Sequence, residues 1–102
     1  MLRQGDVLIR RVRRIPAGAT PVQRDQGRVV LAYGESTGHA HAIAEDEAEM
    51  LQTEEARFLR VLAEGGVSLI HEEHATITVP PGEYEVVLQR EYTPEAIRRV
   101  SD

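Results

Sequence analysis

The sequence contains four histidines, and they occur as two close pairs, His39-x-His41 and His71-x-x-His74. Residues two apart on an extended strand point to the same side, so His39 and His41 are expected to aim their imidazoles at one point. A second strand that carries His71 would supply a third ring nitrogen. A turn or bulge at Glu72-Glu73 would bring His74 back toward the same point. This spacing favours a metal site.

The donor atoms available to such a site are nitrogens of imidazole and oxygens, because the chain contains no cysteine. The candidate oxygen ligands are Glu45, four residues after His41, and Glu72 or Glu73. Nitrogen and oxygen donors suit a divalent transition metal, namely zinc, iron(II), manganese, nickel or copper(II). The expected ligands are His39, His41 and His71, with His74 or Glu45 completing the set.

The number of protein ligands decides what this site would do. With three, the metal keeps an open position at which it activates water or binds O₂ or a small anion, as a hydrolase or an oxygenase requires. With four, the site is structural and the chain is a binding or assembly module. A metal-free alternative uses two histidines as acid and base in phosphodiester cleavage, with Arg10 or Arg90 holding the phosphate. In the simplest alternative, the histidines are ordinary polar residues on loops and strand ends, or hydrogen-bonded core residues.

The segments that must position the histidines have the composition of short β-strands separated by turns. Residues 54–64 fit either a short helix or the return strand of a hairpin after residues 48–53, and their strand-like neighbours favour the hairpin. A single helical turn is expected at residues 93–97. The sequence therefore predicts an all-β fold of about seven or eight strands, forming one small antiparallel barrel or sandwich. The other predicted strands are residues 6–12, 28–33, 39–44, 67–71, 76–79 and 83–92.

Length and composition predict a single folded β domain over residues 1–102, with 41 % apolar and 28 % charged residues. The net charge of −5 argues against a general nucleic-acid binder, although seven of the twelve arginines precede position 29. No segment has the roughly 18 apolar residues of a membrane span. The polar start of the chain lacks the apolar stretch of a secretion signal, so a cytoplasmic location is expected. In so small a chain, a pocket for a small-molecule or anionic ligand would be easier to build in a homo-oligomer.

Two resemblances accompany these residues. The pattern Gly34-x4-His39-x-His41-x3-Glu45 is similar to the first half of the cupin signature, which implies His39, His41 and Glu45 as metal ligands inside a small cupin-like β-barrel. The chain as a whole resembles a small family of uncharacterised bacterial and phage proteins, for which no activity is implied. Its shared segments stand here as Thr37 to His41, His71 to His74 and Gln89 to Tyr92.

Overall fold

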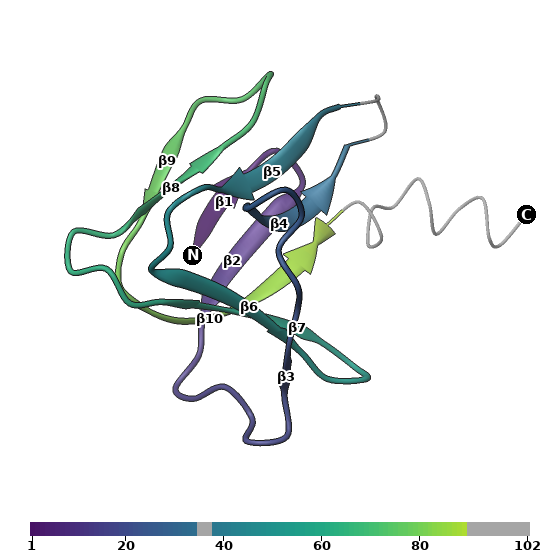
Figure 1. Ribbon diagram of the computed structural model, residues 1–102, viewed down its shortest axis with the longest axis vertical. Coiled ribbons are helices and arrows are strands. Elements are labelled where there is room, and N and C mark those ends of the chain that lie inside the picture. Colours follow the sequence, from purple (N-terminus) through teal and green to yellow (C-terminus); the bar gives the residue numbers. More distant parts are fainter. Residues whose placement is uncertain (35–37, 90–102) are drawn as a thin grey trace, which may run out of the picture.

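The computed structural model describes residues 1–34 and 38–89, which form ten β-strands in two antiparallel sheets without an α-helix (Figure 1). The four-stranded sheet has the order β4 (Val29–Tyr33), β5 (Ala40–Ile43), β8 (Val67–Ile70) and β9 (Ile77–Val79). The six-stranded sheet has the order β1 (Leu2–Gln4), β2 (Val7–Arg11), β10 (Gly82–Leu88), β7 (Arg57–Val61), β6 (Ala48–Gln52) and β3 (Thr20–Pro21).

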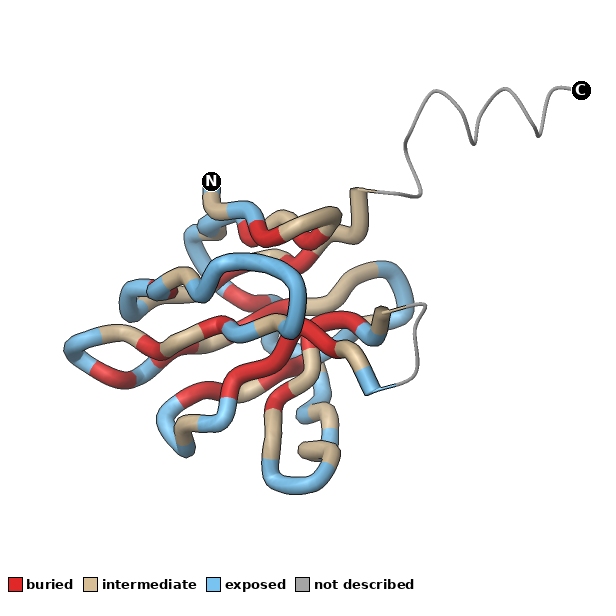
Figure 2. Tube along the Cα trace, turned by 90° about the horizontal axis from the view of Figure 1, so that it is seen from above, coloured by how far each residue is buried: buried red, intermediate tan, exposed pale blue. Residues whose placement is uncertain are grey.

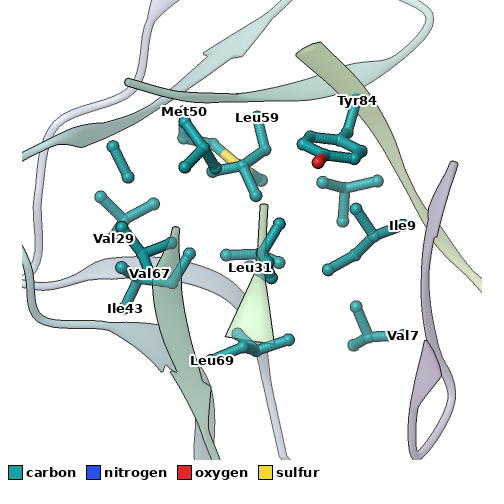
Figure 3. Close-up of a cluster of buried hydrophobic side chains, with 14 of the residues drawn as sticks. Val7, Ile9, Val29, Leu31, Ile43, Met50, Leu59, Val67, Leu69 and Tyr84 are labelled. Carbon is teal, nitrogen blue, oxygen red and sulfur yellow. The ribbon is translucent and has the colours of Figure 1, made fainter. Parts of the chain in front are cut away.

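The two sheets pack face to face, because the longer strands, such as β2, β4 and β10, turn alternate apolar side chains toward the other sheet. Ile9 and Leu59 of the six-stranded sheet meet Leu31, Ile43 and Leu69 of the four-stranded sheet in one core, and all five are fully buried (Figure 3). Figure 2 shows buried positions along the strands and exposed ones at the outer bends of the loops. The arrangement confirms the predicted all-β class as a sandwich, and its sheets do not close into a barrel.

The hairpin predicted in the middle of the chain is confirmed. Strands β6 and β7 pair in register, with Met50 opposite Leu59 and Leu51 opposite Phe58. Both faces of this hairpin carry apolar side chains, so its sequence lacks the strict alternation that would distinguish a strand from a helix. Met50 enters the main core, whereas Leu51 and Phe58 form a second cluster on the other face with Ile15.

The described residues form ten strands rather than seven or eight, because two very short strands were not predicted. β1 contains three residues and β3 contains two, so neither shows an alternating pattern long enough to be recognised, whereas the equally short β9 was predicted over residues 76–79. The expected helical turn at residues 93–97 and the last positions of the strand predicted over residues 83–92 lie outside the described residues. Among the residues that the structure describes, no helix is long and apolar enough to span a membrane.

Ile15 reaches the second cluster from the connection between β2 and β3, and Glu83 holds that connection in place. The Ile15 backbone N–H donates a 2.7 Å hydrogen bond to one carboxylate oxygen of Glu83, and the Arg60 Nε donates a 3.2 Å bond to the other. The bond from Ile15, followed by the bond and charge of Arg60, lowers the pKa of the Glu83 carboxyl. The ionised carboxylate is therefore the form that anchors the Ile15 segment.

Replacing Glu83 with glutamine should lower the free energy of unfolding by about 1 kcal/mol at neutral pH, because charge-assisted hydrogen bonds become neutral ones. Since the folded-state pKa of Glu83 is lowered, its contribution is present above the unfolded-state pKa and is lost as pH falls through the folded-state pKa. Urea unfolding between pH 7 and pH 3 should therefore show a smaller loss of stability on acidification in Glu83→Gln than in the unmodified protein. Parallel pH profiles for the two proteins would contradict this role.

Candidate metal centre

The structure gathers all four histidines at one end of the four-stranded sheet. His39 and His41 stand at the start of β5, and His71 and His74 follow β8. Because β5 and β8 are antiparallel neighbours, with Ala42 opposite Ile70, the start of one strand lies beside the end of the other. The ring centroid of His71 lies 5.9 Å from that of His39, 4.2 Å from that of His41 and 4.8 Å from that of His74. Two pairs thirty residues apart thus share one centre.

Three residues of this cluster present ligand atoms to a common point. One ring nitrogen each of His39 and His71 and a carboxylate oxygen of Glu72 lie within 4.8 Å of one another. The Glu72 carboxylate is held by a 3.0 Å hydrogen bond from the backbone N–H of Ala40 on the neighbouring strand. This bond, followed by one from its own backbone N–H, lowers the pKa of Glu72, so the carboxylate is ionised at neutral pH. Two imidazoles and one carboxylate therefore converge.

His41 lies beside this group and is buried, with its ring orientation fixed by Gln4. The Gln4 side-chain nitrogen donates hydrogen bonds of 2.9 Å to the Leu69 carbonyl and 3.0 Å to the Ala75 carbonyl. With its nitrogen used in this way, Gln4 turns its side-chain oxygen toward His41, at 2.8 Å from Nδ1. An amide oxygen can only accept a hydrogen bond, so His41 Nδ1 is the donor and carries the proton. His41 Nε2, which lies 3.8 Å from an Asp6 carboxylate oxygen, keeps its lone pair in the neutral ring. A histidine that donates one N–H to a carbonyl-type oxygen is in the usual form of a metal ligand.

His74 approaches the centre over a glycine in the β1–β2 turn. Gly5 has a φ of +60°, and a Cβ atom built there would lie 2.7 Å from His74 Nε2. A side chain at position 5 would therefore collide with the imidazole. Gly5 thus serves both the left-handed turn and the close approach of His74.

The carboxylates predicted as ligands are divided between two ends of β5. Glu45 lies beyond the far end of the strand from His39, and its carboxylate accepts a 3.0 Å hydrogen bond from the Ser68 N–H. The ligand set that the cupin resemblance implies is therefore not assembled in this structure, and the carboxylate oxygen that lies beside the ring nitrogens of His39 and His71 belongs to Glu72. Glu73 has a carboxylate oxygen 3.7 Å from His39 Nδ1, and its backbone N–H donates a 3.0 Å bond to His71 Nδ1.

Sequence reasoning missed the contribution of the β1–β2 turn, which places Gln4, Gly5 and Asp6 against the histidines. A glutamine before a Gly-Asp turn looks like any polar turn residue, and only its burial at 3 % exposure marks it as part of the site. Of the two arginines in the metal-free alternative, Arg10 forms an ion pair with Glu85 on β10. Arg90 lies outside the described residues.

Comparison with known proteins identifies the family of this chain. No curated protein and no solved structure matches the chain. One family model, described as a domain of unknown function (DUF8820), matches residues 3–89, a span that contains the four histidines, Gln4 and Glu72. The match agrees with the expected membership of a small uncharacterised family. The chain belongs to the DUF8820 family.

Proposed function

We propose that this protein binds a divalent transition metal through His39, His71 and Glu72, and that the metal keeps an open position for a small ligand. The observation that carries the proposal is the convergence of the three ligand atoms within 4.8 Å. Two imidazoles and one carboxylate are the donors of catalytic zinc sites in hydrolases and of non-haem iron(II) sites in oxygenases. A metal bound in this way activates water or polarises a bound oxygen atom.

The other two histidines have supporting roles in this proposal. His41, held by Gln4 with its Nδ1 protonated, offers Nε2 as a further ligand or as a proton acceptor. The ring of His74 lies 4.8 Å from that of His71, on the exposed side of the centre. Binding through His71 Nδ1 would replace the hydrogen bond from Glu73 N–H, and this exposed group can turn to water instead.

The burial pattern favours a functional metal over a structural one. The core between the sheets joins residues from strands of both sheets, and the proposed ligands are outside it. Glu72 is exposed, and His39 and His71 are only partly buried. We therefore expect the apoprotein to fold, with the metal adding stability only by mass action. We also expect the protein to act in the cytoplasm.

The test is metal binding by untagged protein after exhaustive dialysis against a chelator. Calorimetric titration with Zn²⁺ and Co²⁺ should give one site per chain, and Co²⁺ should develop visible absorption bands. Saturating Zn²⁺ at about 100 times its dissociation constant should raise the free energy of unfolding by about 2.7 kcal/mol. The circular dichroism spectrum of the apoprotein should remain that of a folded β protein. Unfolding upon metal removal would show a structural site instead.

Matched substitutions separate ligands from bystanders. His71→Ala should weaken metal binding by at least about 100-fold, and Glu72→Gln should weaken it by about tenfold, since glutamine keeps an acceptor for Ala40 but loses the charge. Glu45→Gln is the control, because its carboxylate faces Ser68, and should leave the affinity unchanged. The proposal fails if the protein binds no metal, or if His71→Ala and Glu45→Gln bind it equally.

A further inference from the structure

A cavity of about 180 Å³ adjoins the proposed metal centre. Its lining residues are Arg28, Ala40, Ile70, His71 and Glu72, so it shares two residues with the ligand group. The lining residues lie in or beside three neighbouring strands of the four-stranded sheet. Ala40 belongs to β5, Ile70 belongs to β8, and Arg28 directly precedes β4. A small molecule in this space would contact both His71 and Glu72 of the ligand group and also Arg28.

Arg28 is well placed to meet an anion. Its backbone is fixed by two hydrogen bonds with Asp25, one in each direction, of 2.9 and 3.1 Å. Within residues 1–34 and 38–89, its guanidinium forms no hydrogen bond or ion pair. The carboxylate of the neighbouring Asp25 accepts a hydrogen bond from the Tyr33 hydroxyl instead. A guanidinium offers parallel N–H donors that match the two oxygens of a carboxylate.

The remaining walls are apolar and set the size of the ligand. Ile70 is 41 % exposed and Ala40 is buried. Contact with a ligand would cover this exposed apolar surface. About 180 Å³ holds roughly six water-sized groups, at about 30 Å³ for each water in the liquid.

We propose that this cavity binds a short-chain monocarboxylate, with its carboxylate between Arg28 and the metal and its alkyl group against Ile70 and Ala40. The inference rests on the proposed metal site. Glu72 is the one carboxylate among the residues that line the cavity, and a divalent cation together with Arg28 would outweigh its charge there, which favours an anion as the ligand. One arginine and one aliphatic wall suit a carboxylate with an apolar tail better than a phosphate, which calls for more donors.

The experiment uses Co²⁺-loaded protein and follows its visible absorption during titration with sodium butanoate, which has six non-hydrogen atoms. Butanoate should perturb the Co²⁺ bands saturably, and the neutral butanamide should bind at least about tenfold more weakly. Arg28→Gln should weaken butanoate binding by about tenfold while still binding one Co²⁺. Arg13→Gln, at an exposed arginine that does not line the cavity, is the matched control and should bind as the unmodified protein does.

A second variant keeps the inference testable if Arg28→Gln does not fold. Ile70→Ala should weaken butanoate binding by about threefold, because it removes apolar contact, and should leave acetate binding unchanged. Absence of Co²⁺ binding by the unmodified protein would overturn the metal site itself. If Co²⁺ binds, equal affinities for butanoate and butanamide, tighter binding of inorganic phosphate than of butanoate, or loss of Co²⁺ from Arg28→Gln would overturn the carboxylate site alone.

Discussion

Replacing Gln4 with leucine should lower the free energy of unfolding by about 3–4 kcal/mol, because it leaves several buried polar groups without their partner. The Gln4 amide satisfies the Leu69 and Ala75 carbonyls and the His41 ring nitrogen at once. Leucine has a similar volume but offers no donor or acceptor. Urea unfolding of the apoprotein measures the effect as a shift of the midpoint at constant slope.

The matched control for this substitution is Gln52→Leu. Gln52 is also a strand glutamine, but its side chain is exposed, so its replacement should change stability by no more than about 0.5 kcal/mol. Gln4→Leu should also weaken Zn²⁺ binding by about 10- to 100-fold. The Leu69 and Ala75 carbonyls on either side of the His71 segment lose their donor, and His41 loses the acceptor that fixes its ring. If the two variants are equally stable, Gln4 does not anchor the site.

Gln4 also shows how far the sequence alone can predict this site. The sequence shows the two histidine pairs because the alternation of side chains along a strand is a local pattern. From that pattern, His39, His41, His71 and His74 were expected to meet, and their rings lie close together in the structure. The hydrogen-bond partner of His41 cannot be predicted from the sequence. Gln4 is 37 positions away in the chain and contacts His41 only because one sheet packs on the other. A buried amide and an exposed one have the same local pattern.

The sequence also could not show which glutamate lies near the histidines. Glu45 follows His41 by four residues, so counting along the chain brings it near the metal. An extended strand instead rises about 3.3 Å per residue, which carries Glu45 roughly 13 Å away along β5. Glu72 is thirty-one positions from His41 in the sequence, yet the β5–β8 pairing sets it beside Ala40. Proximity here follows from strand pairing rather than from sequence separation.

The fold was more accessible to prediction than the site, because its largest elements repeat a simple pattern. The alternation of Tyr84 and Val86 against Glu83 and Glu85 identifies β10, and the same rule identifies β2, β4 and β8. The choice of sandwich over barrel depends on which strands pair at the sheet edges. Three of the four sheet edges in the described residues are the short strands β1, β3 and β9, and the fourth is β4, so the sequence pattern leaves the choice open.

Replacing Gly66 with alanine is expected to lower the free energy of unfolding by about 3 kcal/mol, since it combines backbone strain with a collision. Gly66 has a φ of +81°, and a Cβ atom there would lie 2.7 Å from the backbone oxygen of Val79. That oxygen belongs to β9, whose Val79 pairs with Val67 of β8. The collision therefore meets paired backbone rather than a side chain that can move away.

Gly27 provides the control that separates the two contributions. Its φ of +80° is nearly the same, but a Cβ atom there meets nothing within 4 Å. Gly27→Ala should therefore cost only the strain of the left-handed conformation, about 1 kcal/mol, and the excess in Gly66→Ala measures the contact with Val79. Equal losses in urea unfolding would mean that β9 yields freely to the new methyl group.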